Sequence, residues 1–298
     1  MNFFLNRYKQ LLGENFQGLE KVSIKTCIRI NSLKISDEDL TKRLNKQAVQ
    51  LTKVDFLKTG YYVEKSDFSM GSTPEHLFGY YYIQESASQF AVQVLRPSAG
   101  EQVLDMAAAP GGKTTQMAEY MQNKGVVVAL DILNLRLNSL KNNLERLGVN
   151  NALVYKKDAR FVSDFGLMFD KILLDAPCSG NFIANKDWFM NRDLAGIKEK
   201  TRLQKELLKS AMMVLKPGGT LVYSTCSLEP EENELNIDWF LNKYREKIDL
   251  EKIEGPGQAA YTEVFGQELD ARVARCRRFW PHLSNTQGFF VAKLVKKH

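Results

Sequence analysis

Six side chains that could do chemistry together lie where apolar segments of the sequence end. They are Asp105, Asp131, Asp158, Asp175, Cys178 and Cys226. A cysteine thiolate is a nucleophile that can bond covalently to carbon, and a carboxylate can accept hydrogen bonds from hydroxyl or amine groups. If the apolar segments are parallel strands, their carboxyl ends meet at one edge of a sheet. The sequence therefore predicts a single site that combines two thiols with several carboxylates.

A glycine loop, DMAAAPGGKTT at residues 105–115, lies beside the first aspartate, and three kinds of ligand compete for it. A triphosphate loop needs glycine where this chain has Ala107. The segment KILLDA at residues 171–176 nevertheless resembles a strand that ends in a magnesium-binding aspartate, so a P-loop-like nucleotide-binding protein stays open as an alternative. A dinucleotide loop needs G-x-G-x-x-G, which is absent. A nucleoside without phosphates needs only a short turn of small residues.

The aspartates favour the nucleoside. Asp131 ends an apolar segment nineteen residues after Gly112, where a carboxylate can accept hydrogen bonds from both hydroxyls of a ribose. Asp158 ends the next segment, beside the expected position of an adenine ring. An acidic ring would repel phosphates and suit a sulfonium cation. The ligand that fits best is S-adenosylmethionine.

From about residue 100 the pattern alternates between buried strands and amphipathic helices, which predicts an α/β fold with a mostly parallel sheet covered on both faces. The expected strands are 102–107, 126–131, 152–158, 171–176 and 220–227, and the expected helices are 114–122 and 133–147. KPGG at residues 216–219 predicts a helix stop followed by a turn. GFFVAKLV at residues 288–295 predicts a last, antiparallel edge strand.

The first 70 residues predict a separate small α+β module, followed by a catalytic domain over residues 71–298. Residues 24–34 predict a strand, and Ser36 with Asp39 forms a capping box for a helix that ends near Asn45. Downstream, Thr73 and Pro74 predict a helical turn, and residues 87–95 predict a helix that stops before Pro97. Five basic residues of the module could form a wall that binds RNA, or a solvated basic face: Lys25, Arg29, Lys34, Lys42 and Arg43.

Composition narrows the class of protein. The chain has 298 residues and a net charge of +6, which favours a polyanionic partner over a neutral one, although a generic basic surface would look the same. The four cysteines form no C-x-x-C pair, so we expect neither a metal site nor a disulfide framework. No apolar run approaches the roughly 20 residues that span a bilayer, and the N-terminus has no signal-peptide pattern, so we expect a cytoplasmic location and no membrane contact.

The sequence resembles the Sun-type RNA cytosine-carbon-5 methyltransferases, a family of bacterial rRNA enzymes and eukaryotic and archaeal tRNA enzymes. The matching words are DMAAAPGGKTTQ (105–116), ALD (129–131), KDAR (157–160), LLDAPCSG (173–180), LKPGGTLVYSTCSLEPEENE (215–234) and RFWPHLSNTQGFF (278–290), with IRINSLK (28–34) and YYIQESAS (81–88) upstream. Together they cover nearly the whole chain. The resemblance implies a Rossmann-like class I methyltransferase sheet and an enzyme that uses S-adenosylmethionine to methylate RNA. The compact core is most similar to the small archaeal tRNA enzymes, which implies tRNA as substrate and a monomer; rRNA is the alternative.

The same resemblance assigns roles to individual residues. Sequence alone leaves open which cysteine attacks, but the RNA family uses the cysteine of the threonine-cysteine word, which implies Cys226 as the nucleophile that adds to cytosine carbon 6. Cys178 would then assist product release, Asp175 would bind the cytosine edge, and Lys113 would lie near the base. The implied cofactor-binding residues are Ala107, Ala108, Ala109, Pro110, Gly111, Gly112, Lys113, Asp131, Arg136, Asp158 and Asp175.

Weaker signals complete the set of expectations. A basic and aromatic cluster near the C-terminus could clasp RNA through phosphate contacts and stacking: Arg275, Arg277, Arg278, Phe279, Trp280 and His282. We interpret Cys27 and Cys276 as structural. A catalytically idle RNA-binding protein on the same fold is a third alternative, and the presence of both Cys178 and Cys226 argues against it.

Overall fold

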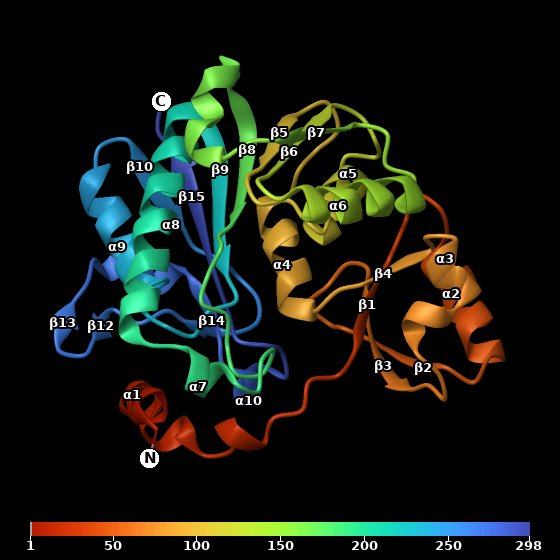
Figure 1. The fold of residues 1–298 in the computed structure, drawn as a ribbon, viewed down its shortest axis with the longest axis horizontal. Helices are drawn as coiled ribbons and strands as arrows, with labels where there is room; N and C mark the ends of the chain where they lie inside the picture. The colour runs from red at the N-terminus through yellow and green to blue at the C-terminus, as the bar shows by residue number, and fades with distance from the viewer. Residues whose placement is uncertain (1) are drawn as a thin grey trace.

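A nine-stranded mixed sheet forms the larger part of the molecule, and a four-stranded sheet lies beside it (Figure 1). This is a computed structural model, and it describes residues 2–298. None of the helices in that range is both long and apolar enough to span a membrane.

Five parallel strands form one half of the large sheet, in the order β7-β6-β5-β8-β9. They are β5 (Gln102–Asp105), β6 (Val126–Asp131), β7 (Ala152–Lys156), β8 (Phe169–Asp175) and β9 (Leu215–Thr225). The chain moves outward from β5 to β7 and then returns to the other side of β5 with β8. Strand order therefore reverses at β5, and open sheets of this kind bind ligands at such a point.

The other half of the sheet is antiparallel and larger than the sequence predicts. Its strands are β10 (Ile248–Glu251), β11 (Gln258–Ala259), β14 (Arg277–Phe279) and β15 (Phe289–Lys296). β15 pairs antiparallel with β9, as expected of the last strand. It is not the edge, because β14 and β10 pair with it on its outer side. Residues 216–219 bulge out between the pairs that Leu215 and Thr220 form with β8, which accounts for the predicted turn at KPGG.

Helices cover both faces of the sheet because successive strand residues point to opposite sides. Val103 packs with the cluster that contains α4, and Leu104 packs with the cluster that contains α8. The helices are α4 (Ser86–Leu95), α5 (Gly112–Tyr120), α6 (Asn134–Leu147), α8 (Leu194–Val214) and α9 (Glu234–Lys243), with the short α7 (Trp188–Asn191) and α10 (Pro281–Ser284). Figure 1 shows α8 and α9 on one side of the sheet and α4 on the other.

The N-terminal module is a four-stranded antiparallel sheet in the order β2-β3-β1-β4, with α2 packed on it. Its elements are β1 (Cys27–Ile30), α2 (Asp37–Lys46), β2 (Gln50–Lys53), β3 (Gly60–Lys65), α3 (Pro74–Leu77) and β4 (Tyr81–Ile83). Ser36 caps α2 by accepting a hydrogen bond from the Asp39 amide, as the capping box predicts. The sheet runs past the boundary placed at residue 70, because β4 pairs with β1.

The first helix, α1 (Phe3–Leu12), does not pack on the module (Figure 1). Its apolar side chains Phe4 and Tyr8 are buried against Trp188 and Trp280 of the catalytic domain. Within the predicted N-terminal module of residues 1–70, α1 thus packs on the large domain and not on the four-stranded sheet.

The remaining elements are short. They are the 3-10 turns at Gly13–Phe16, Leu19–Lys21, Met70–Ser72, Ala159–Phe165 and Ala271–Arg275, and the hairpin of β12 (Glu263–Val264) with β13 (Gln267–Glu268). None of them contributes to the large sheet.

Candidate active site

Two thiols lie in contact at the carboxyl ends of neighbouring strands. Cys178 follows β8, Cys226 follows β9, and their Sγ atoms are 3.0 Å apart as free thiols. The strands are parallel and adjacent, so their ends meet at the same edge of the sheet. Both side chains are partly exposed, whereas Cys27 and Cys276 are buried elsewhere, as structural cysteines would be.

A carboxylate and an ammonium group lie at the same edge. The Lys113 Nζ is 2.6 Å from the Asp175 Oδ2, and the Ser224 hydroxyl donates to the Asp175 Oδ1 at 2.7 Å. Burial by itself would lower the pKa of Lys113, but the charges of Asp175, Asp105 and Cys226 outweigh it, and the pKa is raised. Lys113 is therefore a permanent cation that holds Asp175 in one orientation.

The two cysteines differ in their electrostatic surroundings. The hydrogen bond with Cys226, followed by burial and the charges of Cys226 and Glu232, raises the pKa of Cys178 well above its ordinary value. This raised pKa favours the protonated thiol of Cys178, whose S–H lies within hydrogen-bonding distance of the Cys226 sulfur.

A cavity of about 300 Å³ lies beside the ends of β5 and β6. Its lining residues are Met106, Ala107, Asp131, Ile132, Leu133, Arg136, Asp158, Ala159, Arg160, Pro177, Lys200, Leu203 and Leu207. The Asp131 carboxylate is buried, and its Oδ1 accepts a hydrogen bond from the Leu133 amide. Its Oδ2 accepts none, with the Arg136 guanidinium 3.5 Å away. A buried acceptor without a donor is costly, and hydroxyl groups of a bound ribose would satisfy it.

Three other polar residues of this cavity, Asp158, Arg160 and Arg136, are already paired. Asp158 accepts hydrogen bonds from the Arg160 amide and guanidinium, and these bonds lower the pKa of Asp158. Arg136 donates to the Ala109 carbonyl at 2.5 Å, so it braces the glycine loop. The apolar residues and the free Asp131 oxygen together fit an adenosine with its ribose at Asp131.

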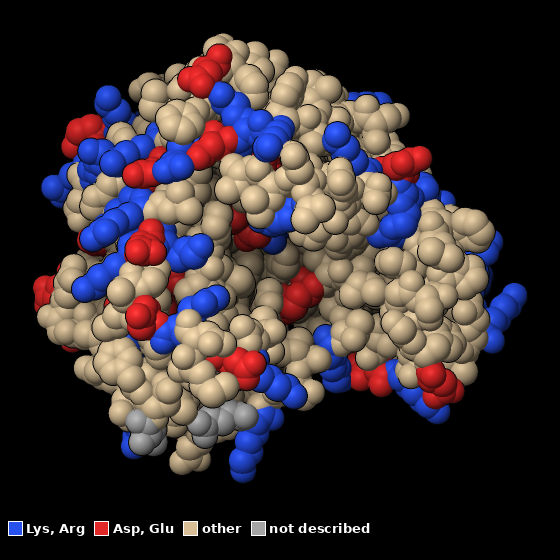
Figure 2. Space-filling view, in the orientation of Figure 1, with Lys and Arg blue, Asp and Glu red and all other residues tan. Residues whose placement is uncertain are grey.

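The glycine loop separates this cavity from a second one. Gly111 caps α5 with φ 108°, a conformation that favours glycine, and an added Cβ would lie 2.9 Å from the Leu140 Cδ1. The second cavity, of about 250 Å³, lies between the module and the large sheet, and both cavities are lined by Ala107. Its other lining residues are Tyr82, Ile83, Gln84, Glu85, Ser88, Ala108, Ala109, Pro110, Gly112, Lys113, Asp175 and Gln287. Figure 2 shows the hollow between the two parts, with acidic side chains inside it.

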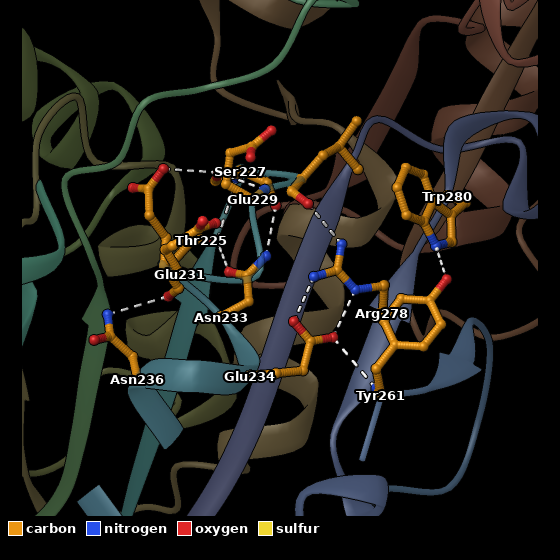
Figure 3. Close-up of polar contacts among 12 residues, drawn as sticks. Thr225, Ser227, Glu229, Glu231, Asn233, Glu234, Asn236, Tyr261, Arg278 and Trp280 are labelled. Carbon is orange, nitrogen blue, oxygen red and sulfur yellow. Dashed lines mark hydrogen bonds and ion pairs between the residues drawn. The ribbon is translucent and has the colours of Figure 1, made fainter. Parts of the chain in front are cut away.

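A polar network holds the segment that carries Cys226 (Figure 3). The Thr225 hydroxyl donates to Asn233, and the Asn233 amide donates to the Ser227 carbonyl. Arg278, which is fully buried, pairs with Glu234 at 2.5 Å and donates to the Leu228 carbonyl. From the other loop, Asn181 donates to the Cys226 carbonyl at 2.7 Å. The sequence did not predict these roles, although three of the residues, Leu228, Asn233 and Glu234, lie in the family word LEPEENE at residues 228–234.

Several residues that were expected to contact a ligand or RNA are instead engaged within the protein. Asp105 is buried and accepts a hydrogen bond from Thr114, so the acidic ring consists of Asp131, Asp158 and Asp175. The predicted RNA clasp is wrong for Arg278, Phe279 and Trp280, which are buried in the core and so cannot contact RNA. Their side chains fill the space between β14 and the helices that cover it. His282 is also not part of a clasp, because it contacts the Asn15 carbonyl at 2.6 Å and thereby fastens the N-terminal segment.

The predicted basic wall of the module is also largely engaged within the protein. Arg29 is buried and pairs with Glu119 of α5, so it cannot contact RNA. Lys34 donates to the Phe78 and Arg146 carbonyls, and Lys25 and Lys42 pair with glutamates of the module. Arg29 and Lys34 thus fasten the module to helices of the large domain, whereas Lys25 and Lys42 form exposed ion pairs at its surface.

The strand order, the glycine loop and the acidic edge define a class I methyltransferase. A family model described as 16S rRNA methyltransferase RsmB/F matches residues 92–295, and a second, described as the N-terminal domain of 16S rRNA methyltransferase RsmF, matches residues 2–86. The chain therefore belongs to the RsmB/F methyltransferase family, and the resemblance to RNA cytosine-C5 methyltransferases is confirmed.

Relatives from different domains of life align over almost the whole chain. The human 28S rRNA (cytosine(4447)-C(5))-methyltransferase is 39% identical in an alignment 306 residues long that covers 99% of this chain and 38% of that protein. The tRNA (cytosine(49)-C(5))-methyltransferase of Pyrococcus abyssi is 36% identical in an alignment 296 residues long that covers 98% of this chain and 95% of that protein. This chain thus spans little more than a third of the human relative.

Solved structures agree with this assignment. A methyltransferase homologue from Pyrococcus horikoshii superposes with a TM-score of 0.91 at 43% identity, over 99% of this chain and 94% of that one. NSun6 from Pyrococcus horikoshii, solved with SFG, superposes with a TM-score of 0.85 at 28% identity, over 99% of this chain and 97% of that one. The predicted fold class and S-adenosylmethionine as cofactor are confirmed. The P-loop alternative is set aside, because the family model that matches residues 92–295 is that of a methyltransferase.

Proposed function

We propose that this chain transfers a methyl group from S-adenosylmethionine to carbon 5 of a cytosine in RNA, and that its substrate is tRNA. The observation that carries the proposal is the pair of thiols 3.0 Å apart beside the Lys113–Asp175 ion pair. Such a pair supplies a nucleophile and a proton donor next to a group that can recognise a base. The cavity at Asp131 would hold the cofactor on the other side of the glycine loop.

The cysteines have separate tasks in this proposal. The Cys226 thiolate adds to carbon 6 of cytosine, which makes carbon 5 nucleophilic enough to form a bond to the methyl carbon. S-adenosylmethionine, when bound, supplies that methyl group on a sulfonium. A base then removes the proton from carbon 5, and the electrons of that bond expel the Cys226 sulfur. Cys178, protonated and in contact with Cys226, assists this release.

Asp175 would recognise the base. The Asp175 carboxylate can accept a hydrogen bond from the exocyclic amine of cytosine, and one from ring nitrogen 3 when that nitrogen takes up a proton as the thiolate adds to carbon 6. Lys113 and Ser224 hold the carboxylate in place. The cavity lined by Lys113 and Asp175 lies at the hollow between the two parts of the molecule. A base inside a helix cannot reach it, so the target cytosine must be unpaired or flipped out.

The choice of tRNA rests on the relative that matches this chain from end to end. The Pyrococcus abyssi protein, whose name gives tRNA cytosine 49 as its target, aligns over 95% of its own length. Ribosomal RNA is a second candidate, because both family models and the human relative are named for rRNA.

The first experiment measures methyl transfer from labelled S-adenosylmethionine to bulk tRNA and to rRNA by the wild type, Cys226→Ala and Cys178→Ala. The same samples are run on a denaturing gel to detect protein joined covalently to RNA. We expect transfer to tRNA by the wild type, neither transfer nor adduct with Cys226→Ala, and an accumulated adduct with Cys178→Ala.

Other results would overturn parts of the proposal. An adduct that survives loss of Cys226 and disappears with loss of Cys178 would exchange the two roles. Methyl transfer to rRNA alone would mean that the substrate is rRNA and not tRNA. Absence of transfer to either RNA would refute the activity.

A further inference from the structure

A buried carboxylate, Glu232, connects the two cysteine loops. Ser179, directly after Cys178, donates its amide at 3.0 Å and its hydroxyl to Glu232. Ser227, directly after Cys226, donates its hydroxyl to the same carboxylate at 2.8 Å. Gln204 of α8 donates at 2.7 Å. One carboxylate is thus shared by the residues that follow both thiols.

No cation neutralises this carboxylate. Glu232 is fully buried, and among residues 2–298 no lysine or arginine forms an ion pair with it. Burial of a lone charge is costly unless hydrogen bonds compensate it. Four donor groups offset part of the cost here, although burial still raises the pKa of Glu232. Because three of the four come from the two cysteine loops, movement of either loop would leave part of the charge unsatisfied.

We propose that Glu232 is a positioning residue which holds Cys178 and Cys226 in contact by fastening the residue after each of them. Ser179 and Ser227 also contact each other at 3.1 Å, so the two loops form one unit around the carboxylate. The Tyr223 hydroxyl donates to the Glu232 carbonyl and fixes the turn that carries Glu232. The proposal deepens the proposed function, because it explains how two thiols from different loops keep one geometry.

Glu234, two residues further on, provides a matched comparison. It is equally buried, but it pairs with Arg278 and has no hydrogen bond to either cysteine loop except through that arginine, which donates to the Leu228 carbonyl. Loss of Glu234 should therefore lower stability without changing the distance between the two sulfurs. Loss of Glu232 should change that distance.

The test compares Glu232→Gln and the double variant Ser179→Ala with Ser227→Ala against Glu234→Gln and Glu231→Gln, whose native carboxylate pairs with Arg7 instead of a cysteine loop. Glutamine keeps the shape of Glu232, but its side chain has one acceptor oxygen where the carboxylate has two. The four donor groups that share two oxygens in the wild type would then have only one. The first readout is the rate at which dibromobimane bridges the two thiols of the folded protein, measured by fluorescence. It needs no RNA and no cofactor. The second readout is kcat for methyl transfer, with the KM for S-adenosylmethionine.

We expect thiol bridging to slow by about tenfold or more and kcat to fall by about 100-fold in both Glu232→Gln and the serine double variant, because displacement of a reacting group by about 1 Å costs that much. The KM for S-adenosylmethionine should stay within about twofold, since Asp131 and Asp158 are untouched. Glu231→Gln and Glu234→Gln should bridge at the wild-type rate.

Wild-type bridging rates in Glu232→Gln and in the serine double variant would overturn the proposal, and so would equal slowing in Glu234→Gln. If the wild type bridges quickly and Glu232→Gln slowly, but no RNA is methylated, the positioning role stands and the proposed function fails. The two proposals can thus be told apart.

Discussion

At the scale of single residues, the site is defined by groups whose pairing is incomplete within the protein. The Asp131 Oδ2 is buried without a hydrogen-bond donor, and within residues 2–298 the Cys178 thiol is the hydrogen-bond partner of the Cys226 sulfur. Most other polar groups of the site are satisfied. Unsatisfied groups in otherwise well-paired surroundings indicate where a ligand supplies the missing partner.

Replacement of Asp131 by asparagine tests this at the cofactor cavity. We expect the Kd for S-adenosylmethionine to rise by about 10- to 100-fold, because an amide provides one acceptor instead of two and the charge is lost. Isothermal titration calorimetry measures it, with Asp164→Asn, an exposed partner of Lys157, as the matched control. An unchanged Kd would show that the ribose does not bind at Asp131.

At the scale of elements, α1 is docked on the segment that follows Cys226. The Tyr8 hydroxyl donates to Glu229 at 2.6 Å, and Arg7 pairs with Glu229 at 3.1 Å and with Glu231 at 2.7 Å. Burial raises the pKa of Glu229 to about 7, and the charges of Glu231 and Glu232 add to it, against the opposing effects of Tyr8 and Arg7. The contact between α1 and this segment is thus sensitive to pH.

The direction in which pH changes the stability of the fold follows from the raised pKa of Glu229. Between the ordinary value of 4.5 and about 7, the folded protein keeps a proton on Glu229 that the unfolded chain has lost, so the stability of the fold falls as the pH rises through this window. Relative to Glu229→Gln, which cannot titrate, the wild type should lose about 3 kcal/mol of unfolding free energy as the pH rises through this window. Urea unfolding at several pH values measures the difference, and a gap that stays constant with pH would contradict the prediction.

The long helix α8 carries five basic side chains, of which Lys200 lines the cofactor cavity. They are Lys198, Lys200, Arg202, Lys205 and Lys209, and none of them takes part in the ion pairs found within residues 2–298. Figure 2 shows lysine and arginine side chains gathered over this region. Lys205 and Lys209 lie 5.0 and 5.7 Å from the centre of the Trp239 ring, and burial and the charge of Lys209 lower the pKa of Lys205. Unpaired cations in a row favour contact with phosphates.

The double variant Lys205→Ala with Lys209→Ala should therefore bind RNA more weakly. We expect the Kd for tRNA to rise by about tenfold near physiological salt, and the salt dependence of binding to fall by about two counterions. Fluorescence anisotropy at several salt concentrations measures both, with Lys252→Ala, a surface lysine paired with Glu254, as the control. Equal affinity and an equal salt slope would place the RNA elsewhere.

At the scale of the whole molecule, the module is fastened to the catalytic domain by a buried charge. Arg29 of β1 pairs with Glu119 of α5 at 3.2 Å and donates to the Gly112 carbonyl at 2.5 Å, next to Lys113. Both charged side chains are almost fully buried. The module therefore contributes a support for the glycine loop as well as one wall of the cavity at Asp175.

Replacement of Arg29 by methionine should lower the free energy of unfolding by about 3–5 kcal/mol, because it leaves Glu119 buried without a cation. The double variant Arg29→Met with Glu119→Met should recover most of that loss, since both charges are then removed. Urea unfolding measures both variants. A double variant as unstable as the single one would mean that the pair acts through packing rather than charge.

The sequence by itself determined the parallel strands, the glycine loop and the positions of the reactive groups. Local patterns carry this information: an apolar run that ends in Asp131 or Asp175 is visible in one strand, and Gly111 is required by the turn that it forms. That these residues meet at one edge also follows from the local pattern, because parallel strands place their carboxyl ends at the same edge of the sheet.

Only the tertiary structure decided which polar residues are free to contact a ligand and which are paired inside the protein. Arg29 and Arg278 are basic residues in motifs that favoured RNA binding, yet both are buried against glutamates distant in the sequence. Glu232 gains its importance from Ser179, which lies 53 positions away along the chain. Such pairings depend on which segments pack together, and a side chain's local sequence does not encode the partner that burial gives it.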